Sequence, residues 1–70
     1  MKPVIACELH GLIEGSTGHY HLEMTVLVKH EASGAPAGSR GFSSSLESVD
    51  FQRGIAVTRN SIYSFEPIVL

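Results

Sequence analysis

The sequence has almost none of the residues with which small domains reinforce a limited core. Cys7 is the only cysteine, so a disulfide framework within the chain and a cysteine-rich zinc module are both excluded. The chain has 70 residues, and a core of this size contributes only about 3 to 5 kcal/mol of net stability. Because 43% of the residues are hydrophobic, burial between subunits is the remaining reinforcement. We therefore expect a homo-oligomer, most simply a twofold dimer.

Positive charge and long apolar runs are also scarce. Five Lys and Arg residues face seven Asp and Glu, for a net charge of -2, and binding to many phosphates requires clustered Lys and Arg. A nucleic-acid partner is therefore not expected. No stretch approaches the roughly 20 apolar residues of a membrane span, and Glu8 and His10 interrupt the region where a signal peptide would have its apolar core. We expect no membrane partner and a cytoplasmic location.

Alternating apolar and polar residues predict a β-hairpin in the first third of the chain. From Tyr20 to Val28 every second residue is apolar, which is the period of a half-buried strand. A first strand over about 3–14 and a glycine-bounded turn at 15–18 complete the hairpin. The register that segregates both strands places Glu8 opposite Thr25 and His10 opposite Glu23, because a slip of one residue would turn a whole strand over.

The middle of the chain changes character sharply. Small residues dominate 31–41 and predict an exposed flexible loop over about 31–43, which is too short to separate two domains. We therefore expect a single domain over 1–70. Ser44 with Glu47 three residues later matches a capping box, and Phe42, Leu46 and Val49 lie at helical spacing. A short helix near 45–50 is expected, with an irregular serine-rich strand as the alternative.

The last third is predicted to form a second hairpin from strands over 51–58 and 61–69. Pro67 cannot donate a ladder hydrogen bond, so the final strand is expected at a sheet edge. The fold class is therefore mostly β, with two antiparallel hairpins in a small sheet or open barrel, and α+β is the alternative if the short helix forms. The expected cross-strand pairs are Val57 with Ile62, Arg53 with Glu66 and Gly54 with Phe65.

The first hairpin carries the best candidate for chemistry. His19, His21 and Glu23 alternate along one strand, and the predicted register brings His10 opposite Glu23. Alternate positions lie about 6.6 Å apart, so two imidazoles and a carboxylate could chelate a divalent ion such as zinc. The alternative is a solvated strand face with a cross-strand hydrogen bond. Catalysis is not expected, because an open sheet face does not shield acid and base groups from water.

These observations favour a non-enzymatic protein-interaction or structural module that self-associates and binds a protein partner through a strand edge or an exposed loop. The expected contact residues are Tyr63, Phe65, Ile68 and Leu70 of the final strand and Arg40 of the loop. One alternative is a metal-binding protein that uses His10, His19, His21 and Glu23. A second is a small acidic inhibitor from a mobile element that blocks a basic surface of a nucleic-acid enzyme, with Glu8, Glu14, Glu23, Glu31, Glu47 and Asp50 as its acidic residues.

Overall fold

The chain forms a mixed, six-stranded β-sheet, seen here in a computed structural model that describes residues 1–30 and 33–68. The strand order is β3-β2-β1-β6-β5-β4, and no described residue is helical. The expected mostly-β class is confirmed, and none of the described residues forms a helix able to span a membrane. The strands are β1 (Val4–Glu14), β2 (Tyr20–Val26), β3 (Arg40–Phe42), β4 (Leu46–Asp50), β5 (Ile55–Thr58) and β6 (Ile62–Ser64).

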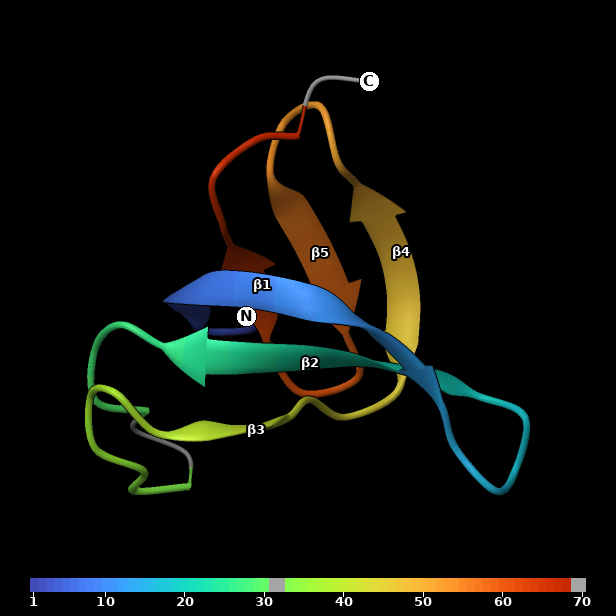
Figure 1. Cartoon of the computed structure of the whole chain (residues 1–70), viewed down its shortest axis with the longest axis horizontal. Helices are drawn as coiled ribbons and strands as arrows, with labels where there is room; N and C mark the ends of the chain where they lie inside the picture. Colours follow the sequence, from blue (N-terminus) through green and yellow to red (C-terminus); the bar gives the residue numbers. More distant parts are fainter. Residues whose placement is uncertain (31–32, 69–70) are drawn as a thin grey trace.

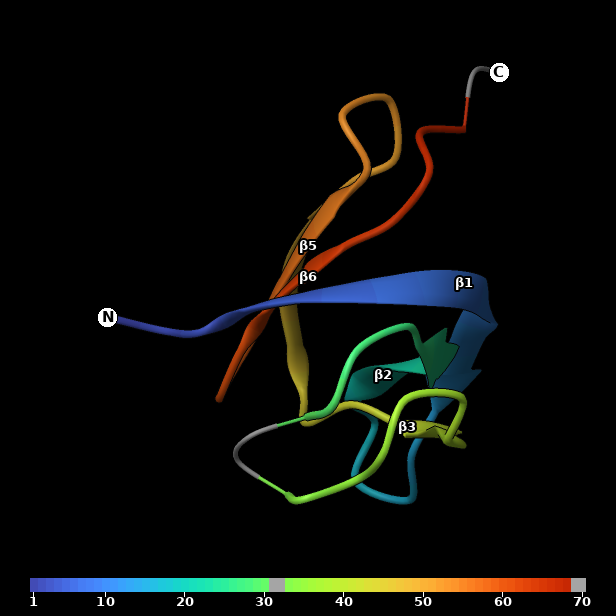
Figure 2. The same ribbon diagram turned by 90° about the vertical axis from the view of Figure 1, so that its left-hand side faces the viewer.

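The long strand β1 joins the two halves of the sheet. Its first residues, Val4 to Ala6, pair with β6 in parallel, and from Cys7 onward it pairs with β2 in antiparallel fashion. Figure 1 shows β4 and β5 crossing β1 and β2 at a steep angle. Figure 2 shows β4, β5 and β6 as a layer seen nearly edge-on, from which β1 leads to β2 and β3. The core fills the space between the halves and consists of Ile5, Cys7, Leu22, Met24, Val26, Ala56, Tyr63 and Phe65.

The first hairpin is confirmed, but a β-bulge shifts half of its register. Glu8 pairs with Thr25 as expected, whereas beyond Leu9 the register slips, and Gly11 instead of His10 lies opposite Glu23. A bulge sets two residues of one strand against one residue of the other. The extra residue is His10, and the shift places Leu12 opposite the fully buried Leu22. Leu12, which the regular register assigned to the polar face, thereby shares a face with Leu22 but remains 42% exposed.

The predicted helix near 45–50 is wrong, because this segment is strand β4. The register of β4 against β5 slips between Leu46 and Ser48, which marks a second bulge at Glu47. In a bulged strand, residues three apart can share a face. Leu46 and Val49 both pack against the core in this way. The apolar spacing that resembles a helix is therefore produced by a strand with one extra residue.

The second hairpin has the predicted register, but its place in the sheet differs from the expectation. Val57 pairs with Ile62, and the Phe65 N–H donates to the Gly54 carbonyl over 2.9 Å. The last strand is not at an edge: β6 lies between β1 and β5 and covers only Ile62–Ser64. The edges are β3 and β4.

The segment expected to be a loop contains edge strand β3. Arg40 and Phe42 pair with Thr25 and Glu23 of β2. The connection before β3 folds back onto β2, because the Gly38 N–H donates to the Val26 carbonyl over 2.7 Å. The predicted loop over 31–43 is therefore too long at its C-terminal end.

Candidate functional site

The residues of the predicted metal site point to separate partners. His10 Nε2 lies 2.7 Å from Thr25 Oγ1, and His21 Nδ1–H donates to the Ser43 carbonyl over 2.9 Å. Glu23 accepts from Arg40 Nη2 at 3.3 Å, and His19 lies in the exposed turn before β2. Across residues 1–30 and 33–68, no three His, Cys, Asp or Glu side chains come together to hold a metal ion. The bulge at His10 and the hydrogen bonds of His21 and Glu23 account for this separation.

The predicted contact residues divide between core and surface. Tyr63 and Phe65 are only 3% and 6% exposed, so in this fold they present almost no surface to a partner. Central placement of β6 buries them, because they pack between the two halves of the sheet. Ile68 is 41% exposed and Arg40 lies on the surface in β3, whereas Leu70 lies outside the described residues.

The acidic residues of the inhibitor alternative are partly paired within the chain. Glu47 accepts from Lys2 Nζ at 2.6 Å, and Asp50 lies 3.7 Å from Arg53 Nε. Glu23 pairs with Arg40, as described above, and Glu31 lies outside the described residues. These contacts neutralise part of the negative surface on which electrostatic binding to a basic partner would depend.

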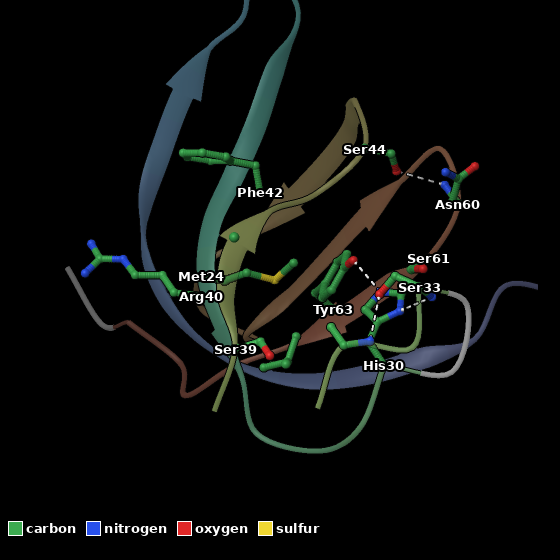
Figure 3. A pocket seen from close by; sticks show the side chains of 13 residues that line it. Met24, His30, Ser33, Ser39, Arg40, Phe42, Ser44, Asn60, Ser61 and Tyr63 are labelled. Atoms are coloured by element: carbon green, nitrogen blue, oxygen red, sulfur yellow. Dashed lines mark hydrogen bonds between the residues drawn. The ribbon is translucent and has the colours of Figure 1, made fainter. Parts of the chain in front are cut away.

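A cleft of about 400 Å³ lies beside strand β3. A volume in this range is typical of ligand sites. Met24 and Val26 of β2 form one wall, and Asn60 and Ser61 of the β5–β6 turn lie across from β3. Figure 3 shows Met24, Tyr63 and His30 on one side of the β3 ribbon, while the side chains of Arg40 and Phe42 point away from them. The cleft is thus bounded by the edge strand itself.

Gly41 opens the cleft at the middle of β3. It pairs with Met24, and directly opposite residues of an antiparallel pair lie on the same face of the sheet. A Cβ atom built at Gly41 has no other atom within 4 Å. The space that a side chain of β3 would occupy is therefore empty and belongs to the cleft.

A chain of hydrogen bonds forms the polar side of the cleft. The Ser33 backbone N–H donates to His30 Nδ1 at 3.3 Å, so this nitrogen carries no proton. The opposite nitrogen, Nε2, is then the donor to the Tyr63 hydroxyl at 3.0 Å. Burial raises the pKa of the Tyr63 phenol, while the neighbouring Ser61 hydroxyl opposes this shift and Cys7 adds to it. Both imidazole nitrogens of the buried His30 are therefore engaged in holding the loop and β6 together.

The Ser61 hydroxyl is the least satisfied polar group of the cleft. Ser61 is 1% exposed, and its Oγ has no hydrogen-bond partner of regular geometry among the described residues, although it influences the Tyr63 phenol. Its backbone, in contrast, is well bonded, because the Ser61 carbonyl accepts from Thr58 Oγ1 at 2.9 Å. Buried hydroxyls normally have partners, so this side of the cleft retains unused hydrogen-bonding capacity.

The outer edge of β3 carries backbone groups that have no hydrogen-bond partner among the described residues. The Val26 N–H donates to the Ser39 carbonyl, and the Ser43 N–H donates to the Leu22 carbonyl. Hydrogen-bonded and non-hydrogen-bonded pairs alternate in an antiparallel ladder, so the pair between these two, Gly41 with Met24, is also a hydrogen-bonded one. The N–H and C=O groups of Arg40 and Phe42 then face away from β2. They form a template for one further strand.

The sequence pattern singled out Arg40, which lines the cleft, but it did not single out His30 or Gly41. The partner of His30 is Tyr63, 33 residues further along the chain, and no local pattern connects them. Gly41 stands in a glycine-rich segment in which one more glycine carries no signal. Only the pairing of β3 with β2 shows that this glycine faces a cleft.

The fold and the cleft define a small all-β domain with an unpaired strand edge beside an open pocket. Comparison of the chain with models of protein families, with curated proteins and with solved structures gives no match.

Proposed function

We propose that this protein is a binding module that takes an extended segment of a protein partner as an additional strand along the edge of β3. The observation that carries the proposal is the coincidence of two features at one place. The backbone groups of Arg40 and Phe42 face outward from the edge strand, and this same strand borders the cleft. In strand addition, main-chain hydrogen bonds supply affinity and pockets for alternate side chains supply specificity.

The other sheet edge is less suited to strand addition. Strand β4 contains the bulge at Glu47 and carries a second carboxylate at Asp50, and both side chains are exposed. Bulges and charged side chains are the usual means by which a sheet edge avoids pairing with another chain. Strand β3 has no register shift in its pairing with β2. This comparison supports β3 as the binding edge.

The hydrogen bonds of His30 support a binding role over an enzymatic one. A general base needs a nitrogen free to take a proton from a substrate. His30 Nδ1 accepts from the Ser33 N–H, and Nε2 donates to Tyr63. The imidazole at the cleft thus acts as a structural link.

We also propose that the chain self-associates, as its size and composition suggest. Val4, Leu27 and Phe42 each expose half or more of their surface, at 67%, 54% and 60%, and burial of such side chains between subunits would supply further stability. Native mass spectrometry of the untagged chain should show a dimer or a larger oligomer. A monomer at micromolar and higher concentrations would contradict this part of the proposal.

Selection from a library of random eight-residue peptides displayed on phage tests strand addition. The decisive variant is Phe42→Pro, which removes the outward N–H of β3 while the hydrogen bonds of Gly41 to β2 remain, and proline is tolerated at such edge positions. The matched control is Phe42→Ala, which removes the side chain but keeps the N–H. We expect enriched peptides to bind Phe42→Pro at least about tenfold more weakly than the wild type and Phe42→Ala within about threefold, since a lost edge hydrogen bond leaves a peptide carbonyl without a partner.

The circular dichroism spectrum of each variant shows whether it is folded. If Phe42→Pro is not folded, Arg40→Pro removes the other outward N–H and replaces it in the comparison. Failure to enrich any peptide, or equal binding to the proline and alanine variants, would overturn the proposal.

A further inference from the structure

We infer that the cleft beside β3 selects one residue of the added strand, the residue opposite Gly41, and that it accepts a large uncharged side chain there. This inference rests on the proposed strand addition and specifies which partner sequences the site would take. It uses three observations that are independent of the edge groups of β3: the empty space at Gly41, the composition of the cleft walls and the position of Arg40, the one charged residue among the described lining residues.

The register of an added antiparallel strand determines which of its side chains enters the cleft. Arg40 and Phe42 would form the new hydrogen bonds, so the partner residue opposite Gly41 belongs to a non-hydrogen-bonded pair, in which opposite Cα atoms are only about 4.5 Å apart. Its side chain lies on the same face as Gly41 and Met24. This is the face on which the cleft opens, and Gly41 leaves the space next to it empty.

The size and walls of the cleft favour a large side chain. The volume of about 400 Å³ is bounded by the apolar groups of Met24 and Val26 and by the ring of Tyr63. Burial of a large apolar side chain against such walls contributes favourably in proportion to the area removed from water. An alanine at this position of the partner would leave most of the cleft empty.

The charges around the cleft disfavour an ionised side chain. Arg40 is the only described lining residue with a formal charge, and its guanidinium is paired with Glu23 at 3.3 Å. Figure 3 shows that the Arg40 side chain points away from Met24, Tyr63 and His30. A charged side chain in the cleft would lose its water without gaining a counter-ion. Uncharged polar ends are compatible, because the Ser61 hydroxyl and the Asn60 amide line the opposite side.

The test uses the peptides enriched in the selection described above. The position opposite Gly41 is identified from nuclear Overhauser effects between the peptide and the Gly41 α protons. Peptides with Leu, Phe, Gln, Ala, Glu or Lys at this position are then titrated against the wild type. We expect Ala, Glu and Lys to bind at least about tenfold more weakly than the best of Leu, Phe and Gln.

Two glycine substitutions show whether the cleft causes this preference. Gly41→Val fills the cleft entrance from within, and the new Cβ meets no atom within 4 Å. Gly11→Val is the matched control: Gly11 is also in a strand, has the same open surroundings and faces away from the cleft, opposite Glu23. We expect Gly41→Val to reduce the difference in affinity between the peptides to less than about threefold. We expect Gly11→Val to preserve this difference.

The outcomes separate this inference from the proposed function. If enriched peptides respond to Phe42→Pro but bind equally well with any residue opposite Gly41, or if Gly41→Val leaves the preference unchanged, the cleft inference is overturned and strand addition stands. If no peptide responds to Phe42→Pro, strand addition itself fails.

Discussion

Substitution of Gly54 by alanine should be among the most damaging single changes in the protein. Gly54 has a φ of +68°, in the left-handed region that costs a residue with a Cβ atom about 1 to 2 kcal/mol. In addition, an alanine Cβ would lie 2.1 Å from the Phe65 carbonyl oxygen. Because real Cβ contacts do not come below 3.0 Å, the backbone of Phe65 would have to move by about 0.9 Å, the difference between 3.0 Å and 2.1 Å.

The size of the effect follows from what this movement disturbs. The Phe65 N–H donates to the Gly54 carbonyl, and such a bond contributes about 1 kcal/mol. Phe65 also belongs to the buried core, where forced repacking costs about 1 to 3 kcal/mol. The lost hydrogen bond, the repacking of the core and the φ angle together predict that Gly54→Ala lowers the free energy of unfolding by about 3 to 6 kcal/mol. This approaches the whole stability expected of so small a core.

A second glycine distinguishes the cost of the positive φ angle from the cost of the close approach to Phe65. Gly38 also has a positive φ, of +89°, but a Cβ atom there meets nothing within 4 Å. Gly38→Ala should therefore lose only the cost of the φ angle, about 1 to 2 kcal/mol. Urea denaturation followed by far-ultraviolet circular dichroism measures both variants, with an osmolyte such as trimethylamine oxide added if Gly54→Ala is unfolded in water. Equal losses in the two variants would refute the close approach of Gly54 to Phe65.

Three further predictions concern the interior and the N-terminus. Thr58→Val should cost about 1 to 3 kcal/mol in the same denaturation assay, because Thr58 is fully buried and its hydroxyl takes part in three hydrogen bonds; a variant as stable as the wild type would contradict this network. Burial raises the pKa of the Cys7 thiol from 9.0 to about 11, so the folded protein keeps a proton that the unfolded chain loses, and stability should fall as the pH rises from 9 to 11. Cys7→Ala should remove up to about 2.7 kcal/mol of this decline, and unchanged pH dependence would show that the thiol does not contribute. Lys2→Ala should cost about 1 to 2 kcal/mol, because Lys2 Nζ pairs with Glu47 at the surface and also donates to the part-buried Thr58 carbonyl over 2.7 Å; a variant as stable as the wild type would contradict both contacts.

Local patterns predicted the parts of the fold that depend on local pairing. Apolar alternation located β2, and the short turn before Ile62 set the register that pairs Val57 with Ile62. The helix near Leu46 and Val49 was predicted wrongly because a bulged strand and a helical turn both place residues three apart on one face. The shift at His10 has the same origin. A bulge is not visible in the sequence when either register buries a reasonable set of side chains.

The site was less predictable, because it depends on pairing across the length of the chain. Burial of Tyr63 follows from the placement of β6 between β1 and β5, and β6 finds its parallel partner in residues near the N-terminus. Once β6 is central, the free edges pass to β3 and β4. Arg40 was expected at the binding surface for its place in a loop, and the structure gives it a different setting, in an edge strand beside the cleft.

The parallel pairing of β1 with β6 also determines when this protein can acquire its structure. Val4 pairs with Ile62, so the chain must be synthesised as far as β6 before its two halves can join. Contacts between residues this far apart in sequence close slowly, because the entropy of the intervening loop is lost before the contacts stabilise the product. During synthesis the first hairpin can form early, but its apolar face has no cover until β6 emerges from the ribosome. In that interval the nascent chain exposes the strands that later form the core, and its yield in the cell should depend on how quickly β6 follows them.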